Sequence, residues 1–146
     1  MNRERHAIPA RTVIAKAYLS QDRPNPREVA FIIPGNPIPW ARQRIARNGH
    51  HFTDARTKRA KETVAAHALN EMSRGGRQPL TGPVKVTLLF FRETRQRCDL
   101  DRLCSLPLDA MNEIVYDDDL QVVELKARKE VDKEYPRTEI VVEEML

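Results

Sequence analysis

Aspartate side chains are concentrated in one part of this sequence and are its best candidates for chemistry. Asp117, Asp118 and Asp119 stand side by side, and one residue separates Asp99 from Asp101. Neighbouring carboxylates repel each other, so such a run either faces water or gathers around a cation. In an extended chain, residues i and i+2 point to the same side, so Asp99 and Asp101 can aim at one point. Carboxylate oxygens suit Mg²⁺, so we expect a magnesium site, with an ordinary exposed acidic turn as the alternative.

The spacing of these aspartates is compatible with hydrolysis of a phosphodiester. Asp109 follows Asp101 by eight residues, which is about two turns of a helix. We expect the strand after the acidic run to pair with the apolar strand at 83–91, which would bring the acidic run and the earlier pair to one edge. A metal held there orients and activates a water and neutralises charge on the phosphate. An EF-hand is excluded, because the segment from Asp99 lacks an oxygen ligand at its fifth position and the glycine after it.

Charge is distributed unevenly along the chain, although the formal net charge is only +4. Residues 1–97 carry 19 Lys and Arg against 7 Asp and Glu, whereas residues 98–146 carry 6 against 14. A cationic surface beside a separate acidic cluster is typical of a protein that meets a polyanion at a metal site. A solvated surface with no such partner is the alternative interpretation.

The elements expected to position the aspartates alternate between strands and helices. A helix is predicted over 53–76, with Thr53 or Asp54 as its cap and Gly75-Gly76 as its stop. A second helix is expected to begin near Ser105, which would place Pro107 in the first turn, where its missing N–H matters little. The apolar stripe of the first helix comprises Val64, Ala65, Ala68, Leu69 and Met72. Strands are predicted at 29–35, 83–91, 120–129 and 138–145.

This order of elements predicts an α+β domain in which two helices pack on a mixed β-sheet. The predicted domain covers residues 29–146, which is enough chain for one hydrophobic core. Residues 1–28 are rich in Arg and Pro and are expected to form a basic N-terminal extension, because RPNP at 23–26 disfavours a helix.

Neither a membrane span nor a secretory signal is apparent in the sequence. No run of eighteen apolar residues occurs, and the N-terminus lacks an apolar h-region. Cys98 and Cys104 match no zinc spacing, so we expect two reduced thiols in a cytoplasmic protein.

Five short motifs together resemble the RusA family of Holliday junction resolvases. In order along residues 29–146 they are F-I-I-P-G-x-P, P-W-A-R-x-R, D-L-D, L-D-A-M and Y-D-D-D-L-Q-V-V. The resemblance implies a compact, dimeric, RusA-like fold and a small, often prophage-encoded endodeoxyribonuclease. It further implies a nuclease that depends on Mg²⁺, or alternatively Mn²⁺, and acts on branched four-way DNA in recombination and repair.

The resemblance also assigns roles to individual aspartates. It implies that Asp99, Asp101 and Asp119 hold the metal and that Asp118 and Asp109 support them. The chain departs from the family pattern at three positions. Arg102 replaces an asparagine, Ser105 replaces the catalytic lysine, and Cys98 stands where a basic residue usually precedes the first aspartate, with Arg97 one step earlier. That lysine is expected to stabilise charge in the transition state, and Arg102 is the expected substitute.

Basic residues outside the acidic run are the candidate DNA contacts. Arg42, Arg44 and Arg47 match the basic loop that follows the first strand of the family, and they can bind phosphates or remain solvated. Lys126 and Arg128 either reach DNA or pair with glutamates of the last strand.

Three functions remain open from the sequence. The first is a Mg²⁺-dependent junction endonuclease, in which Asp99, Asp101, Asp119 and Arg102 are catalytic. The second is a catalytically weakened or inactive protein that still binds junctions. The third is a structural protein whose acidic cluster holds Ca²⁺ or Mg²⁺.

Overall fold

The computed structural model describes residues 26–41 and 44–145, in which the predicted α+β domain is confirmed. Its four long strands are β1 (Glu28–Pro34), β4 (Val84–Arg92), β5 (Val122–Val131) and β6 (Arg137–Glu144). Its helices are α2 (Ala55–Arg74), α3 (Leu100–Ala110) and the short 3₁₀ helix η1 (Asp119–Gln121). A small hairpin, β2 (Arg44–Ile45) with β3 (His51–Phe52), was not predicted. The predicted extension at 1–28 lies almost entirely outside the described residues.

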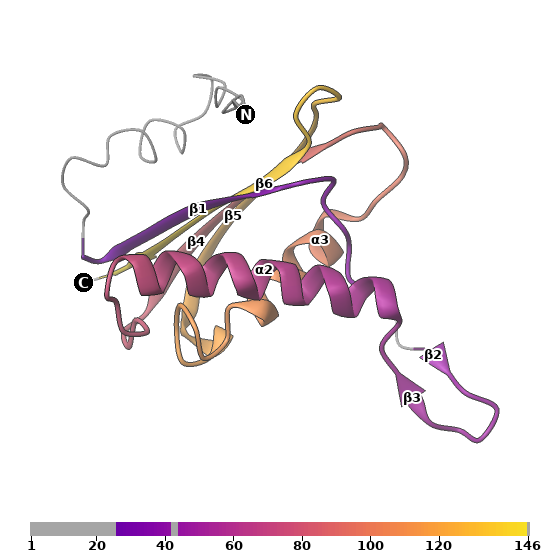
Figure 1. Cartoon of the computed structure of the whole chain (residues 1–146), viewed down its shortest axis with the longest axis horizontal. Helices are drawn as coiled ribbons and strands as arrows, with labels where there is room; N and C mark the ends of the chain where they lie inside the picture. Colours follow the sequence, from indigo (N-terminus) through magenta and orange to yellow (C-terminus); the bar gives the residue numbers. More distant parts are fainter. Residues whose placement is uncertain (1–25, 42–43, 146) are drawn as a thin grey trace, which may run out of the picture.

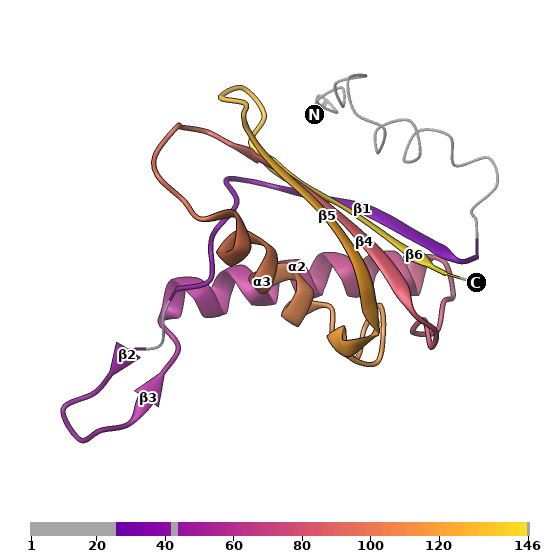
Figure 2. The same cartoon turned by 180° about the vertical axis from the view of Figure 1, so that it is seen from behind.

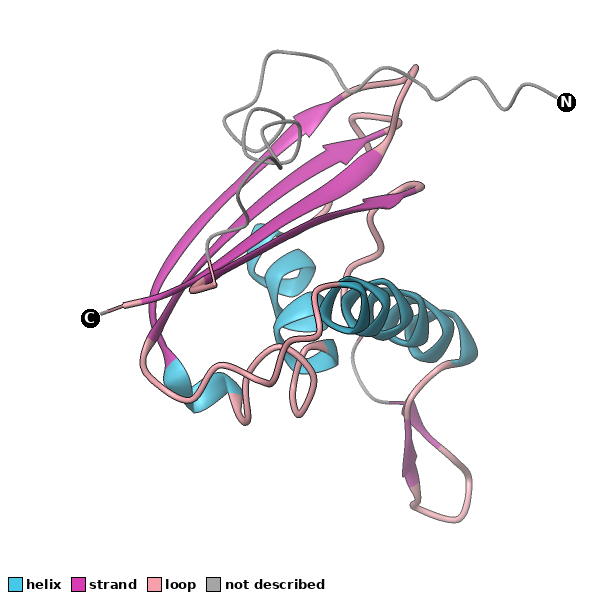
Figure 3. Ribbon diagram, turned by 60° about the vertical axis from the view of Figure 1, so that its left-hand side comes forward, coloured by secondary structure: helices cyan, strands magenta, loops and turns pink. Residues whose placement is uncertain are grey.

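The long strands form one mixed sheet, and both helices lie on the same face of it. The strand order is β1-β6-β4-β5, with β4 antiparallel to β6 and parallel to β5. Figure 3 shows the resulting two layers, with the sheet on one side and the helices α2 and α3 on the other. The second face of the sheet carries no helix of the described chain (Figures 1 and 2).

The hydrophobic core fills the space between the sheet and the helices. Val86, Leu88 and Phe90 of β4 alternate toward this space and are at most 2% exposed, as the two-residue period of a strand requires. On the other face of β4, Phe91 is also buried, with the Arg137 guanidinium 3.8 Å from the centre of its ring. Burial on both faces explains the apolar run at the end of this strand.

Helix α2 begins and ends as the sequence predicts. Asp54 is the cap, since its Oδ1 accepts a hydrogen bond of 2.8 Å from the Thr57 amide, and Gly75 follows the last turn. Ala68 and Met72 are buried as expected. Leu69 is 56% exposed, so the predicted apolar stripe is wrong at this position.

The predicted start of the second helix is wrong. Helix α3 begins at Leu100 with Asp99 at its cap position, and Pro107 lies inside the helix. The Oγ of Ser105 donates to the Asp101 carbonyl, 2.9 Å away, instead of capping a helix. A proline inside a helix costs about 3 kcal/mol, but four other buried residues of α3 contribute more than that by packing on the sheet.

The strand after the acidic run, β5, pairs with β4 as expected. Because the two strands are parallel, however, this pairing does not bring the acidic run to the end of β4. Val84 is opposite Val122, and Arg92 is opposite Val131. The start of β5 and the end of β4 therefore lie at opposite ends of the sheet, and α3 spans the distance between them. The expectation that the acidic run and the Asp99/Asp101 pair share one edge is wrong for this reason. Both instead lie along α3.

The β2–β3 hairpin extends beyond the first turn of α2, away from the sheet (Figures 1 and 2). Ile45 and Phe52 of this hairpin are exposed. Among the helices of the described residues, none is both long and apolar enough to cross a membrane.

Candidate active site

The acidic run forms a tight turn that is fixed by one glutamine. Asp118 caps η1, accepting a 2.8 Å hydrogen bond from the Leu120 amide. The side chain of Gln121 accepts hydrogen bonds from the amides of Asp117 and Asp118, at 2.8 and 3.0 Å. Its amide nitrogen donates to the carbonyls that precede β4, those of Leu80 and Gly82, at 2.8 and 2.9 Å. The position of Asp119 is therefore set by contacts of the turn with a distant loop.

The carboxylates of Asp109, Asp118 and Asp119 lie near one another. The pKa of Asp119 is raised above its usual value by partial burial, by a hydrogen bond with Asp118, and by repulsion from Asp118 and Asp109. The pKa of Tyr116, whose hydroxyl donates to the Leu108 carbonyl, is raised by burial and by the same three carboxylates. Negative charge therefore accumulates at the C-terminal end of α3, where a bound cation would relieve the repulsion.

Two of these carboxylates line an open pocket against α3, which we call the acidic pocket. It has a volume of about 450 Å³ and is lined by Trp40, Ala41, Arg102, Ser105, Leu108, Asp109 and Asp119. Trp40 is fixed to α3 by a 3.0 Å hydrogen bond from its amide to the Arg102 carbonyl. The Trp40 side chain is half-buried and packs against the core.

Asp99 and Asp101 lie at the other end of α3. Asp99 is exposed and faces Arg102, whose Nε is 3.7 Å from its Oδ2. Burial, together with the negative charge of Asp101, raises the pKa of the Cys104 thiol to about 11. Asp101 therefore lies near Cys104. The residue before Asp99 is fixed by Lys129 of β5, which donates a 2.6 Å hydrogen bond to the Cys98 carbonyl. Both cysteines are buried free thiols, as predicted.

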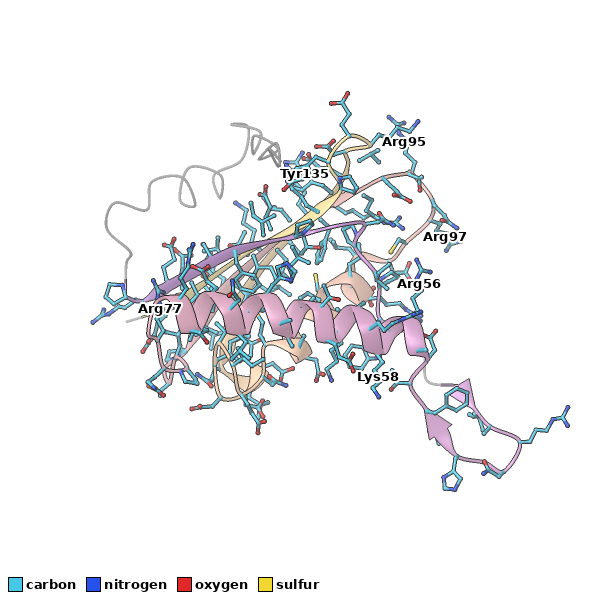
Figure 4. The ribbon with its side chains drawn as sticks, viewed as in Figure 1. Arg56, Lys58, Arg77, Arg95, Arg97 and Tyr135 are labelled. Atoms are coloured by element: carbon cyan, nitrogen blue, oxygen red, sulfur yellow. The ribbon has the colours of Figure 1, made fainter. Side chains whose placement is uncertain are left out.

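A second pocket adjoins the acidic pocket, and we call it the arginine pocket. Its lining includes the guanidinium-bearing residues Arg56, Arg92, Arg97 and Arg102, together with Asp54 and Asp99. Arg92 is 9% exposed, and its Nε has no hydrogen-bond partner among the described residues. A buried donor without a partner costs about 1–3 kcal/mol, so an anion entering the pocket would be stabilised there. Arg56 and Arg97 reach it from α2 and from the loop before α3 (Figure 4).

Carboxylate oxygens are the type of ligand that a hard cation such as Mg²⁺ prefers, so these side chains are chemically suited to bind one. Within the described chain, however, no group of three or more His, Cys, Asp or Glu side chains is close enough to hold a metal ion. Asp101 and Asp109 are separated by about 12 Å along the helix axis, from the rise of 1.5 Å per residue. The metal set of Asp99, Asp101 and Asp119 therefore stays a prediction, with Asp119 at the more negative end.

The predicted DNA contacts fall into three groups. Arg42 and the side chain of Arg44 lie outside the described residues. Arg47 is exposed in the hairpin loop. Lys126 and Arg128 are opposite Thr87 and Leu89 of β4, which alternate with the core residues; they therefore face the side of the sheet without helices. Arg128 pairs with Glu130 at 2.7 Å.

The sequence carried only a general signal for the basic residues in and beside the two pockets. Arg56 and Lys61 are basic residues in the first turns of α2, where acidic residues are preferred, and Arg97 stands two residues before Asp99. Their individual contacts were not predictable. Lys61 forms an ion pair with Asp109 and lies 5.4 Å from the centre of the Trp40 ring. Arg56, Arg92 and Arg97 meet only because α2, β4 and the loop before α3 converge.

Comparison with known proteins identifies the family of the chain. No curated protein matches the chain. A family model described as "Endodeoxyribonuclease RusA" matches residues 34–143, which run from the last residue of β1 to Glu143 of β6 and include the linings of both pockets. The chain therefore belongs to the RusA family of Holliday junction-resolving endodeoxyribonucleases.

Proposed function

We propose that this protein is a Mg²⁺-dependent endonuclease that cleaves four-way DNA junctions, with Mn²⁺ as an alternative metal and the cytoplasm as its location. The observation that supports this proposal most strongly is that a pocket lined by carboxylates adjoins a pocket lined by arginines. The acidic pocket and the arginine pocket share Trp40, Ala41 and Arg102 in their linings. Carboxylates for a metal and cations for phosphates therefore border one continuous surface along α3.

The cation that fits here would supply a Lewis acid that activates water and neutralises charge on a phosphate. Asp119, with Asp109 and Asp118 beside it, provides most of the negative charge that would attract such a cation. Asp99 and Asp101 are also proposed as metal ligands from the start of α3, although in this structure they lie at the opposite end of the helix from Asp109. We assign Asp118 and Asp109 to the support of Asp119.

The arginine pocket is proposed to position the DNA. Arg56, Arg92 and Arg97 come from three different segments and line the same pocket as Asp99, so one phosphate can contact several of them. Guanidinium groups bind phosphate oxygens in pairs, and such contacts fix the register of DNA on a protein. Arg47 is proposed to extend this basic surface onto the hairpin, and Arg42 and Arg44 remain phosphate contacts proposed from the sequence.

We also propose that the protein acts as a homodimer through β5. This strand is an edge of the sheet, and its backbone on the outer side has no neighbouring strand among the described residues. Val123, Leu125 and Val131 of β5 are 63%, 45% and 44% exposed, and Leu120 just before it is 86% exposed. Although β5 alternates these apolar residues with charged ones, its outer backbone edge and exposed apolar side chains provide a site for association with a second copy. Leu125→Glu should give a monomer in sedimentation analysis.

The test of the enzyme is cleavage of a labelled four-way junction by the full chain during a Mg²⁺ titration. We expect paired nicks that depend on Mg²⁺ and disappear in Asp119→Asn, while junction binding without metal persists. Lys85→Met is a control, since Lys85 pairs with Glu124 on the opposite face of the sheet. Binding without any cleavage by the wild-type protein would support the second function, a junction-binding protein without activity, because Ser105 replaces the family's lysine.

A further inference from the structure

Lys61 is a cation beside the acidic pocket, where it contacts two of the residues that line it, Asp109 and Trp40. It lies on α2 between the buried residues Thr57 and Val64, which are four residues before it and three after it. Residues at these spacings share one face of a helix, so Lys61 leaves α2 toward α3. Its partners confirm this direction, because Asp109 and Trp40 both line the acidic pocket.

Two contacts fix the ammonium group of Lys61 at the rim of that pocket. Its Nζ forms an ion pair with Oδ2 of Asp109, and it lies 5.4 Å from the centre of the Trp40 ring. Trp40 is itself attached to α3 through the Arg102 carbonyl. The side chain of Lys61 nevertheless remains 41% exposed, so a phosphate in the pocket can reach the charge.

The ammonium group of Lys61 lies in the neighbourhood of Ser105, the position where this chain lacks the lysine of its family. Ser105 and Asp109 are four residues apart on α3 and line the same pocket, which places their Cβ atoms about 5–6 Å apart. Ser105 offers no charge, and its hydroxyl is occupied by the Asp101 carbonyl. A positive charge at this place comes from the neighbouring helix instead. Arg102, the substitute expected from the sequence, faces Asp99 nearer the other end of α3.

We propose that Lys61 is a catalytic residue of the reaction put forward above, and that it substitutes from α2 for the lysine absent at position 105. In this role its ammonium contacts an oxygen of the scissile phosphate and stabilises the charge that builds during cleavage. Asp109 holds the side chain in place before DNA binds. The proposal rests on the proposed nuclease function. The alternative is an ordinary surface ion pair, which contributes about 0–1 kcal/mol to stability and nothing to cleavage.

The test compares Lys61→Met with Lys85→Met in the full-length protein. Lys85 is a matched control, because it also pairs with a carboxylate, at 3.7 Å from Glu124, and its side chain is 33% exposed. Single-turnover cleavage of a labelled junction should fall on the order of 10²–10³-fold in Lys61→Met and remain within about twofold in Lys85→Met. Junction binding in EDTA should change by less than about tenfold, because one phosphate contact among several is lost.

A rescue experiment separates this role from a structural one. Lys61→Met/Ser105→Lys should recover most of the lost rate, because the new lysine enters the same pocket from α3, whereas a purely structural pair would not be restored in this way. Equal cleavage by Lys61→Met and the control, in an active wild-type protein, overturns the role of Lys61 and leaves the nuclease intact. A loss that Ser105→Lys does not rescue also overturns it. A wild-type protein that binds junctions but never cuts them overturns the nuclease and this role together.

Discussion

Gln121 holds the acidic turn to the body of the domain, and its replacement by glutamate is the sharpest test of the site's construction. The Gln121 side chain donates to the carbonyls of Leu80 and Gly82 and accepts from the amides of Asp117 and Asp118. Gln121→Met removes all four hydrogen bonds without adding charge. Gln121→Glu keeps an acceptor for the two amides but sets a carboxylate oxygen against the two carbonyls.

The expected loss of stability depends on whether each hydrogen bond of Gln121 is exposed or partly buried. The two amides are in exposed contacts, where water can replace the side chain, whereas the two donated bonds are partly buried. At about 0.5–1.5 kcal/mol each, losing the donated pair should cost about 2 kcal/mol in Gln121→Met. For a domain of this size, that lowers the melting temperature by about 4–8 °C.

Gln121→Glu should be the less stable of the two at pH 7, and its deficit should depend on pH. Repulsion from the carbonyls and the neighbouring aspartates raises the pKa of the new carboxyl above its ordinary value of about 4.3. Because the pKa of this carboxyl is raised in the folded state, the full loss of stability is present at pH values above that pKa. The loss is relieved as the pH falls through the pKa and the carboxyl becomes protonated. Between pH 7 and about 5, the melting temperature of Gln121→Glu should therefore rise relative to that of Gln121→Met.

The assay is thermal unfolding followed by circular dichroism between pH 5 and 7, with Gln78→Glu as the control for an added charge. Gln78 is exposed in the loop that also contains Leu80, so its replacement should leave the melting temperature unchanged. Equal stability of Gln121→Glu and wild type at pH 7 would refute the reasoning, as would a gap between the two Gln121 variants that pH does not alter.

Three further predictions concern the pockets. In carbon-detected NMR without metal, the carboxyl of Asp119 should titrate above the ordinary aspartate pKa of about 3.9, because Asp118 and Asp109 disfavour its charge. Added Mg²⁺ should lower the midpoint of this titration. In thermal unfolding, Asp119→Asn should abolish the stabilisation of the protein by Mg²⁺. Arg56→Ala and Arg97→Ala should each lower the salt dependence of junction binding by about one counterion, whereas an equal effect of Arg128→Ala would place the DNA on the other face of the sheet. Cys104, with its pKa raised to about 11, should resist alkylation at pH 8 in the native protein, and rapid native labelling would contradict its burial.

The amino-acid sequence was sufficient to predict the class of the fold and the types of group available for chemistry. Helix α2 was predictable because its cap, Asp54, and its stop, Gly75, are local signals. The β4 strand was predictable from its apolar run, and the aspartates were apparent from their spacing. The family resemblance added the proposed role of each aspartate and showed that a lysine is missing at position 105.

How these residues meet depends on packing between segments that are distant in the sequence. The sequence could not reveal that β5 runs parallel to β4, and this direction separates Asp99 from the acidic turn along α3. Helix α3 includes Pro107 because burial of its other residues outweighs a local preference. Lys61 and Asp109 are 48 positions apart in the sequence and meet through the packing of α2 on α3. Local signals act over a few residues, whereas the surroundings of a charge depend on contacts between distant segments, which packing alone selects.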